Sequence, residues 1–303
     1  MTQQLKIAVL GGDARQIAMA RALIEQGFSL SVWGLGEQGR SALKEIRSLS
    51  WQEAVSDANV LLLPLPCSVD GVRLNLPLES SDVSLRLSLL LESFSGKILL
   101  GGRLTSACKL LAEEKGIECI DYFDSEILQL KNALPTAEGA LLIAMQELSV
   151  TLDGCESVVV GYGRIGSLLA EKLRLLGARV SVLARRQEAL TQAALHHHRP
   201  IVFHCKDSYA GITQIPKNCR VIFNTVPQRI FTKELLQKLP QNCLLIDLAS
   251  APGGIDFSAA AELGMHAVWG TALPGKYAPE TAGIFLAQTV KLILEEALEA
   301  RQL

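Results

Sequence analysis

Apolar and polar positions along the chain follow the pattern of an α/β protein. Short apolar runs recur, each followed by a glycine or proline turn and then by a segment with the spacing of an amphipathic helix. Runs that are apolar on both faces are typical of parallel strands buried between helices. The predicted strands are residues 6–10, 29–33, 59–63, 97–100, 116–120, 158–160, 179–183, 221–224, 244–250 and 265–269. Their alternation with helices predicts parallel sheets with helices on both faces.

One strand-turn-helix-strand unit occurs twice, with an offset of 150 residues between its copies. Equivalent positions are Gly11 and Gly161, Gly27 and Gly177, and Val32 and Val182. A unit that repeats in this way predicts two domains of the same architecture. We therefore expect an α/β fold with two Rossmann-like parallel-sheet domains and a cleft between them.

Two predicted helices cross between these domains. One begins with Thr136 as its N-cap, and the other carries Pro279 in its first turn and runs to near residue 300. By analogy with two-domain dehydrogenases, the last helix is expected to pack on the first domain. The predicted substrate-binding domain is 1–130 plus 281–303, and the predicted NADP-binding domain is 131–280.

The second copy contains a G-x-G-x-x-G turn between a strand and a helix. Gly161 allows the tight turn, Gly163 lets a pyrophosphate approach the backbone, and Gly166 lets helix and strand pack closely. The free N–H groups at the N-terminus of the following helix favour the phosphate charge, and Arg164 and Ile165 within the turn are also predicted to bind the cofactor. The alternative is an ordinary βαβ turn that binds no nucleotide. The complete strand-turn-helix-strand unit around the motif favours dinucleotide binding.

The end of the next strand distinguishes between the two nicotinamide cofactors. An NAD site usually presents Asp or Glu to the ribose about 20 residues after the glycines, whereas this chain offers Arg185 and Arg186. Guanidinium groups bind a 2′-phosphate in a fork, so the sequence predicts NADP. The alternative is that both arginines lie at the solvent-exposed start of the next helix and do not contact a cofactor. Further predicted cofactor-binding residues in later loops are Thr225, Val226, Pro227 and Ser250.

The first copy lacks the glycines that a phosphate requires. Asp13 stands at the position of Gly163, and Gln16 stands at the position of Gly166. The Asp13 carboxylate would repel a pyrophosphate, because both are negatively charged. Arg15 and the helix N-terminus are still able to attract an anion of another kind. We therefore interpret the first domain as a substrate domain and not as a second nucleotide site.

Several polar residues follow predicted strands at the sheet edge where α/β proteins bind ligands. Predicted substrate-binding residues are Arg15, Arg103, Asn132 and Ser68, and predicted catalytic residues are Glu138, Lys276 and Asp13. Asp247 is a further candidate for the general base, and the sequence does not choose among them. The alternatives are a helix-surface role for Arg103, and capping or hinge packing for Asn132 and Glu138.

Charge and cysteine content exclude several classes of function. The 303 residues carry a net charge of −2, which gives no electrostatic footprint for nucleic acid or an anionic membrane. No apolar run approaches the length of a membrane span, no signal peptide is evident, and a cytoplasmic protein is expected. Seven cysteines without a C-x-x-C pair are expected to be reduced. No metal site is expected: consecutive His196, His197 and His198 cannot all face one ion, and His204-Cys205 beyond them completes no zinc-like spacing.

Several segments together resemble the A-subunit family of dipicolinate synthase, and the resemblance spans nearly the whole chain in order. The opening Gly-Gly-Asp-x-Arg-Gln and the Pro-Gly-Lys segment are its most specific parts. The segments are 11–16, 132–139, 161–166, 247–250 with 252–254, and 273–276 before 278–279 and 281–282. The triple histidine is not a feature that we associate with the family, and it is expected to lie away from the cleft.

This resemblance implies a role in making dipicolinate in the mother cell of a sporulating bacterium. The substrate would be a dihydrodipicolinate or hydroxytetrahydrodipicolinate ring from the lysine pathway, and the partner would be the flavoprotein-like B-subunit of dipicolinate synthase. The residues themselves are compatible, because Arg15, Arg103 and Lys276 can meet a dicarboxylate. The alternatives are a 2-hydroxyacid, alanine or methylene-tetrahydrofolate type dehydrogenase, and a non-catalytic NADP-binding subunit. The sequence leaves open whether the chain forms a homo-oligomer.

Overall fold

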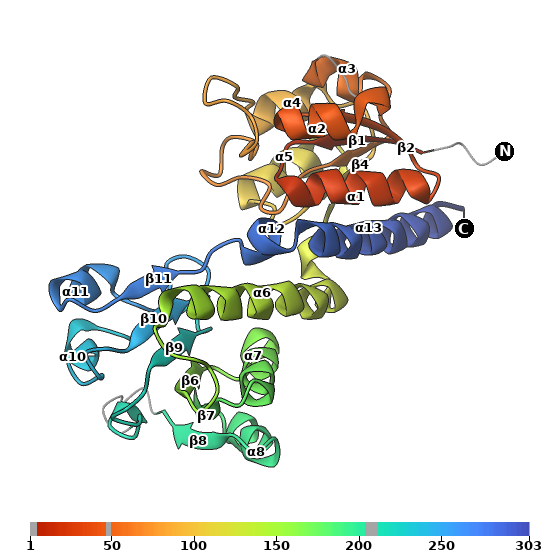
Figure 1. Cartoon of the computed structure of the whole chain (residues 1–303). Coiled ribbons are helices and arrows are strands. Elements are labelled where there is room, and N and C mark those ends of the chain that lie inside the picture. The colour runs from red at the N-terminus through yellow and green to blue at the C-terminus, as the bar shows by residue number, and fades with distance from the viewer. Residues whose placement is uncertain (1–4, 47–49, 204–210, 303) are drawn as a thin grey trace. The chain divides into compact units, whose positions relative to one another are not determined.

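Two compact units make up the chain. A computed structural model describes residues 5–46, 50–203 and 211–302. Unit 1 comprises Met1–Asn132 with Pro274–Leu303, and unit 2 comprises Ala133–Leu273 (Figure 1). Residues 274–280, which the sequence analysis assigned to the second domain, lie in unit 1. Each unit is an α/β domain, so the predicted fold of two Rossmann-like domains is confirmed.

Unit 1 is built on a five-stranded parallel sheet with the order β2-β1-β3-β4-β5. Its strands are β1 (Lys6–Leu10), β2 (Ser29–Trp33), β3 (Val60–Leu62), β4 (Ile98–Gly101) and β5 (Glu118–Asp121). Its helices are α1 (Ala14–Glu25), α2 (Gly36–Ala42), η1 (Lys44–Ile46), α3 (Trp51–Ser56), α4 (Leu87–Ser93), α5 (Ser106–Glu114), η2 (Tyr122–Asp124), α12 (Leu273–Tyr277) and α13 (Pro279–Gln302). The middle strands β3 and β4 are wholly buried, as their apolar runs predict.

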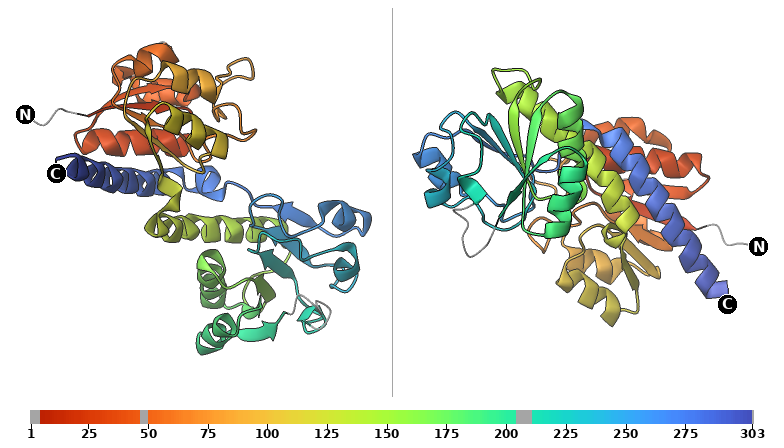
Figure 2. Two further views of the ribbon diagram at one scale, coloured as in Figure 1. Left: turned by 180° about the vertical axis from the view of Figure 1, so that it is seen from behind. Right: turned by 90° about the horizontal axis from the view of Figure 1, so that it is seen from below.

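Helix α13 lies beside α1 in unit 1, as Figures 1 and 2 show from several sides. A Cβ added to Gly283 would meet the Ala18 Cβ at 2.5 Å and the Arg15 carbonyl oxygen at 2.6 Å. The two helices therefore approach closely only because Gly283 has no side chain. Leu286, Ala287, Val290 and Leu294 of α13 are buried and belong to the apolar core of unit 1.

Unit 2 is built on a six-stranded parallel sheet with the order β11-β10-β9-β6-β7-β8. Its strands are β6 (Glu156–Val160), β7 (Arg179–Ala184), β8 (Arg199–Val202), β9 (Val221–Asn224), β10 (Leu244–Asp247) and β11 (Ala267–Trp269). Its helices are α7 (Arg164–Leu175), α8 (Gln187–Leu195), α10 (Lys233–Leu236) and α11 (Phe257–Glu262). Helix α6 (Glu126–Glu147) begins in unit 1 and continues into unit 2.

The internal repeat extends to the strand register. Lys6 pairs with Ser29 in β1 and β2, and Glu156 pairs with Arg179 in β6 and β7, each 150 residues later. The Gly11 N–H donates to the Trp33 carbonyl oxygen at 2.9 Å, and the Gly161 N–H donates to the Leu183 carbonyl oxygen at the same distance. The two turns thus share one backbone plan, and they differ in their side chains.

Three local elements differ from the sequence prediction. Helix α6 begins at Glu126, so Thr136 is not its N-cap but a buried interior residue after Pro135. Packing outweighs the hydrogen bond that proline removes, because the helix buries Leu128 in the core of unit 1 and Ala140 in that of unit 2. Strand β8 and helix α12 were not predicted: Arg199-Pro200 is an unusual strand start, and α12 follows a positive φ of 55° at Ala272.

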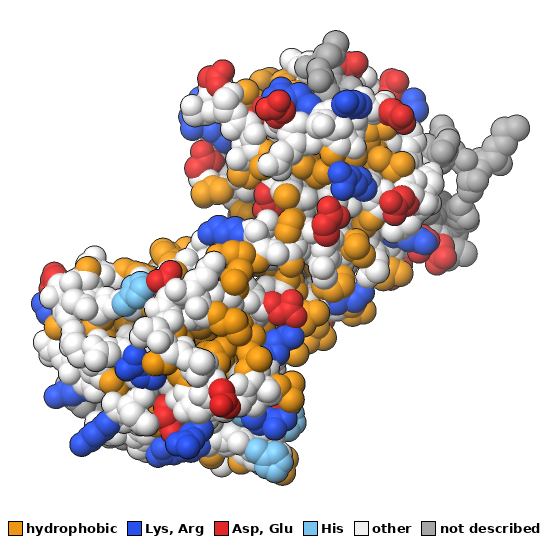
Figure 3. Space-filling view, in the orientation of Figure 1, with side chains coloured by type: hydrophobic (Ala, Val, Ile, Leu, Met, Phe, Trp, Pro, Cys, Tyr) orange, Lys and Arg blue, Asp and Glu red, His pale blue; other side chains and the backbone are white. Residues whose placement is uncertain are grey.

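Six cysteines of the described residues are free thiols, and five of them are buried. They are Cys67, Cys108, Cys119, Cys155, Cys219 and Cys243, with Cys119 the partly exposed one, while His204 and Cys205 lie outside the described residues. Within the described part of the chain, no helix combines the length and the apolar character needed to cross a membrane. On the face drawn in Figure 3, acidic and basic side chains are interspersed.

Candidate functional site

Two glycines of the turn after β6 are required by the packing of the protein itself. Gly161 has a φ of +88°, and a Cβ at this position would meet the Thr225 Oγ1 at 2.5 Å. A Cβ at Gly166 would collide with the carbonyl oxygen of Gly161. These two residues therefore hold the turn and the start of α7 close to β6, as the sequence predicted for the motif.

Gly163 is different, because nothing within the described protein requires a glycine there. Its φ of −97° suits any residue, and a Cβ built on it meets no described heavy atom within 4 Å. It is the N-cap of α7 but supplies no side-chain cap. The space above Gly163 and the first N–H groups of α7 are thus left to a ligand, and this arrangement suits an anion.

A cavity of about 320 Å³ lies next to this turn in unit 2. It brings together five of the predicted cofactor-binding residues, namely Gly161, Gly163, Arg185, Arg186 and Val226. The remaining lining residues, which the sequence analysis did not assign to the cofactor, are Val160, Tyr162, Leu183, Ala184, Ala189, Phe203, Gln228, Arg229, Ile230, Thr232 and Leu235. The glycine turn and the two arginines thus share one pocket.

The other predicted cofactor-binding residues do not line this pocket. Arg164 and Ile165 open α7, and Pro227 is exposed in the loop after β9. The Thr225 Oγ1 donates to the Val160 carbonyl oxygen at 2.9 Å, so this side chain holds the turn. Ser250 is exposed after β10. Their binding roles remain predictions.

The apolar floor and the charged rim of the pocket come from different segments. Ala189 of α8, Ile230 and Leu235 are buried, while Arg229 is half-exposed and lies 3.5 Å from Asp256, measured from Nη1 to Oδ2. Arg229 is a third guanidinium beside Arg185 and Arg186. The sequence places this basic residue two positions after Pro227, in the loop already predicted to bind the cofactor.

Asp247 organises the loops around the pocket. Its Oδ1 accepts hydrogen bonds from the Asn224 side-chain amide at 2.8 Å and from the Ala249 N–H, and its Oδ2 accepts from the N–H groups of Gly254 and Ile255. The residue is completely buried. A carboxylate with four donors is committed to structure, which weakens its case as a general base.

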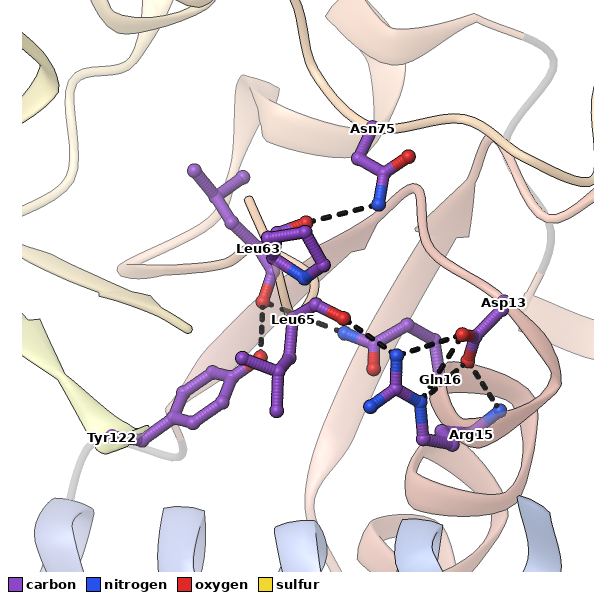
Figure 4. Close-up of polar contacts among 8 residues, drawn as sticks. Asp13, Arg15, Gln16, Leu63, Leu65, Asn75 and Tyr122 are labelled. Carbon is purple, nitrogen blue, oxygen red and sulfur yellow. Dashed lines mark hydrogen bonds and ion pairs between the residues drawn. The ribbon is translucent and has the colours of Figure 1, made fainter. Parts of the chain in front are cut away.

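The equivalent turn of unit 1 is closed by its own side chains (Figure 4). The Asp13 carboxylate accepts from the Arg15 backbone N–H at 3.0 Å and from the Arg15 guanidinium, with 2.7 Å between Nη2 and Oδ2. Arg15 Nη2 also donates to the Leu65 carbonyl oxygen at 2.6 Å. The Gln16 side chain fills the space over Gly12. A carboxylate thus stands at the N-terminus of α1 where a phosphate would otherwise bind.

Helix α12 packs directly on this ion pair. A Cβ on Gly275 would meet the Asp13 Oδ2 at 2.6 Å and the Arg15 Nε at 3.0 Å. The two most specific segments of the sequence, Gly-Gly-Asp-x-Arg-Gln and Pro-Gly-Lys, are therefore one packed structure. Lys276 itself is exposed on α12.

Arg103 lies at the carboxyl end of the unit 1 sheet in a strained conformation. Its φ is +52°, and its backbone N–H donates to Asp121 Oδ1 at 3.0 Å. Its guanidinium carbon lies 5.1 Å from the centre of the Phe123 ring. Strain of this kind persists only where the surroundings enforce it, and it is frequent at binding sites.

The remaining predicted substrate-binding and catalytic residues lie in loops or on helix α6. The Ser68 hydroxyl donates to Asp70 Oδ1 and accepts from the Gly71 N–H, so it caps its own loop. Glu138 is exposed on α6 and pairs with Lys172 of α7 at 3.0 Å. Asn132 is half-buried on α6. Among the described residues no group of three or more His, Cys, Asp or Glu side chains is placed to hold a metal ion.

The two sheets and the glycine turn define a two-domain α/β protein of the Rossmann-like class. Residues 6–123 match the family described as the N-terminal domain of the dipicolinate synthase A-subunit. The whole chain is 28% identical over 296 residues to the dipicolinate synthase A-subunit of Bacillus subtilis, covering 98% of each. The resemblance to the dipicolinate synthase A-subunit is thus confirmed.

Solved structures agree with this result. The crystal structure of the dipicolinate synthase A chain from Bacillus subtilis superposes with a TM-score of 0.81 at 27% identity and 99% coverage of both chains. A transhydrogenase from Sinorhizobium meliloti matches with a TM-score of 0.70 at 17% identity, over 96% of this chain and 92% of that one. D-lactate dehydrogenase from Escherichia coli matches with a TM-score of 0.61 at 12% identity, over 97% of each chain. The last two show a shared fold.

Proposed function

We propose that the chain is the NADP-dependent oxidoreductase subunit of a dipicolinate synthase. It would convert a dihydrodipicolinate or hydroxytetrahydrodipicolinate precursor from the lysine pathway toward dipicolinate, in the cytoplasm of the mother cell during sporulation. Similarity over 98% of the chain to a dipicolinate synthase A-subunit supports the pathway. Because that relative is named as one subunit of a synthase, a partner is also supported, and we propose that it is the flavoprotein-like B-subunit.

The pocket of unit 2 carries the cofactor proposal. It joins a glycine turn, whose middle glycine has no structural reason to lack a side chain, to Arg185 and Arg186. The pyrophosphate would lie over Gly163 at the N-terminus of α7. The arginines would hold the 2′-phosphate that distinguishes NADP from NAD. The buried apolar residues of the same pocket suit the adenine ring.

Unit 1 is the proposed substrate domain. The closed turn at Asp13 leaves no place for a dinucleotide pyrophosphate, and Arg103 lies at the sheet edge where such folds bind ligands. A ring with two carboxylates suits a guanidinium partner. Arg15 is buried in its contacts with Asp13 and Leu65, whereas Arg103 is exposed, so we assign the substrate carboxylate to Arg103 in preference to Arg15.

Oxidation of the ring requires loss of a hydride and loss of a proton. The nicotinamide, when bound, supplies the hydride acceptor. The protein must then bind the carboxylates, orient the ring and accept the proton. Asp13 and Glu138 are both in ion pairs, whereas the Lys276 side chain is exposed to solvent on α12. We propose Lys276 as the first residue to test for the proton-transfer role.

One experiment tests this function directly. Enzymatically generated dihydrodipicolinate is incubated with the purified chain and NADP⁺, with and without the flavoprotein-like partner, while NADPH absorbance and dipicolinate are both followed. We expect NADPH and dipicolinate to appear together. Dipicolinate formation without any nicotinamide reduction, under either condition, would contradict the dehydrogenase proposal.

A second candidate is a protein that binds NADP and substrate but leaves the chemistry to its partner. It is favoured by one observation: three of the four candidate bases are held by other groups, Asp13 by Arg15, Glu138 by Lys172 and Asp247 by four donors. In the same assay, this candidate predicts tight NADPH binding with no turnover by the chain alone. It also predicts that Lys276→Met leaves the turnover of the two-protein mixture unchanged.

A further inference from the structure

Arg103 has the left-handed backbone conformation that usually belongs to glycine. Its φ is +52°, and it follows Gly101, the last residue of β4, by two positions. A side chain at such a φ strains the backbone, and a residue other than glycine keeps this conformation only where its neighbours enforce it. Glycine would occupy the position without strain. A guanidinium is therefore presented beyond the end of β4 at a cost to the backbone.

Two side chains hold the backbone groups of Arg103. The Asp121 carboxylate accepts from the Arg103 N–H at Oδ1, at 3.0 Å, and from the Leu104 N–H at Oδ2, at 2.8 Å. The Cys67 thiol donates to the Arg103 carbonyl oxygen at 3.4 Å. Burial raises the pKa of Cys67, so this thiol keeps its proton at neutral pH. Asp121 can reach the loop because it lies opposite Gly101 in the register of β4 and β5.

The same carboxylate fixes the aromatic ring beneath the guanidinium. Asp121 is the N-cap of the short helix η2, and its Oδ1 accepts from the Phe123 N–H at 2.9 Å. Tyr122, the first residue of η2, is completely buried, and its hydroxyl donates to the Leu63 carbonyl oxygen at 3.0 Å (Figure 4). The Arg103 guanidinium lies over the half-buried Phe123 ring, with its carbon 5.1 Å from the ring centre. One carboxylate thus orders both the cation and the ring on which it lies.

This arrangement suits recognition of a carboxylate by a cation of fixed direction. Arg103 is exposed, and the ring beneath its guanidinium limits the directions that this group can take. A planar guanidinium can donate two parallel hydrogen bonds to one carboxylate. A group whose direction is already set loses less conformational freedom on binding, so its contact with a ligand is stronger.

We propose that Asp121 is a positioning residue for Arg103, and that Arg103 on the Phe123 ring is the carboxylate-binding site of unit 1. This inference rests on the proposed function, in which Arg103 binds a carboxylate of the substrate. It adds the two residues that set the direction of the guanidinium, Asp121 through the backbone and Phe123 through its ring. Asp121 acts only through these neighbours, so its replacement should raise the substrate KM and leave kcat unchanged.

Arg103→Gly separates binding from folding. Glycine adopts the positive φ without strain, and this gain offsets the greater freedom of glycine in the unfolded chain, so we expect a melting temperature within about 2 °C of wild type. The replacement also removes the proposed partner of the carboxylate. We therefore expect the dissociation constant for dipicolinate to rise at least about tenfold, measured by calorimetry on the purified chain with saturating NADPH.

A double-mutant cycle tests whether Asp121 acts through Arg103. Asp121→Asn replaces one acceptor oxygen by an NH2 group, so the side chain cannot accept from all of the Arg103, Leu104 and Phe123 N–H groups. We expect a lower melting temperature and a dipicolinate dissociation constant that rises about threefold to tenfold. With Arg103→Gly already present, the same replacement should still lower the melting temperature but change the dissociation constant by less than about 1.5-fold.

Two further variants complete the set. Asp124→Asn removes an exposed charge from the same short helix and is the matched control, so it should bind dipicolinate as wild type does. Phe123→Leu keeps an apolar side chain but removes the ring under the guanidinium, and we expect about a threefold loss of dipicolinate affinity.

The outcomes distinguish this inference from the proposed function. Unchanged dipicolinate affinity in Arg103→Gly would overturn the inference, and so would an equal effect of Asp121→Asn on that affinity with and without Arg103. Either result leaves the proposed function in place, because the wild type still binds dipicolinate and NADPH. A wild type that binds no dipicolinate, with or without the flavoprotein-like partner, would instead overturn the proposed function together with this inference.

Discussion

Asp13 and Gly163 occupy the same place in two copies of one turn. Each is the N-cap of the helix that follows the first strand of its sheet, with a φ of −99° at Asp13 and −97° at Gly163. The aspartate brings a carboxylate to the helix N-terminus and holds Arg15 with it. The glycine leaves the equivalent space open. One side chain thus separates a closed structural turn from an open anion-binding one.

Gly163→Ala tests the open turn. The backbone conformation suits alanine, so we expect the free energy of unfolding to change by less than about 0.5 kcal/mol. The new methyl group projects toward the expected pyrophosphate, so NADPH affinity should fall at least about tenfold, or about 1.4 kcal/mol. Urea unfolding and calorimetry measure the two quantities. An unchanged NADPH affinity would show that no phosphate approaches Gly163.

Gly166→Ala is the matched variant with the opposite expectation. A Cβ at this position collides with the Gly161 carbonyl oxygen, so the turn and α7 must shift. We expect a loss of about 1–3 kcal/mol in the free energy of unfolding, which is typical of overpacking. Thermal unfolding followed by circular dichroism measures it. If Gly166→Ala were as stable as wild type, the close approach of α7 to the turn would be wrong.

Arg185 and Arg186 should determine the choice of cofactor. Replacing both by alanine removes the charged partners proposed for the 2′-phosphate, which together are worth about 1.5–3 kcal/mol. We expect NADPH affinity to fall about 10- to 100-fold and NADH affinity to change less than about twofold. Fluorescence titration with both cofactors measures this. Equal losses for NADH and NADPH would place the arginines elsewhere on the dinucleotide.

Arg103 and Arg15 should respond differently to replacement by methionine. Arg103→Met removes an exposed guanidinium, so the substrate KM should rise about tenfold while NADPH affinity stays unchanged. Arg15→Met leaves the Asp13 carboxylate without its partner, so the free energy of unfolding should fall by about 1–3 kcal/mol. Steady-state kinetics and urea unfolding separate the two effects. Loss of cofactor binding alone in Arg103→Met would mean that unit 1 is not the substrate domain.

Gly275→Ala tests the packing of α12 on the ion pair. The added Cβ would lie 2.6 Å from the Asp13 Oδ2 and 3.0 Å from the Arg15 Nε, so one of the three residues must move. We expect a destabilisation of about 1–3 kcal/mol, measured by urea unfolding. Gly71→Ala is a useful reference for glycine replacement in a loop, because a Cβ there meets no described heavy atom within 4 Å, although its φ of +80° brings strain.

The main parts of the fold follow from the sequence because they are local. Strand and helix patterns alternate clearly, and the repeat brings Gly11 onto Gly161 without reference to any long-range contact. The predicted start of α6 was wrong because Pro135 and Thr136 look locally like a helix start. Burial of both ends of that helix in two cores overrides this signal, and burial cannot be read from neighbouring residues alone.

The candidate site was predictable only where one short motif carries it. The glycine turn and the two arginines belong to a single βαβ unit, so their spacing predicts their meeting in one pocket. Contacts between segments that are far apart in the sequence could not be predicted from the spacing of a motif. Gly275 packs on an ion pair about 260 residues earlier in the chain, and the Tyr162 hydroxyl meets His196 across the end of α8. Only the folded backbone brings these residues together.

The most direct test of the central claim is a titration of the purified wild-type chain with NADPH and with NADH at one pH and ionic strength. The pocket joins the open glycine turn to Arg185 and Arg186, so we predict that both cofactors bind and that NADPH binds at least about tenfold more tightly, a difference of about 1.4 kcal/mol. Equal affinities would contradict the NADP preference, and binding of neither cofactor would contradict the dinucleotide site itself.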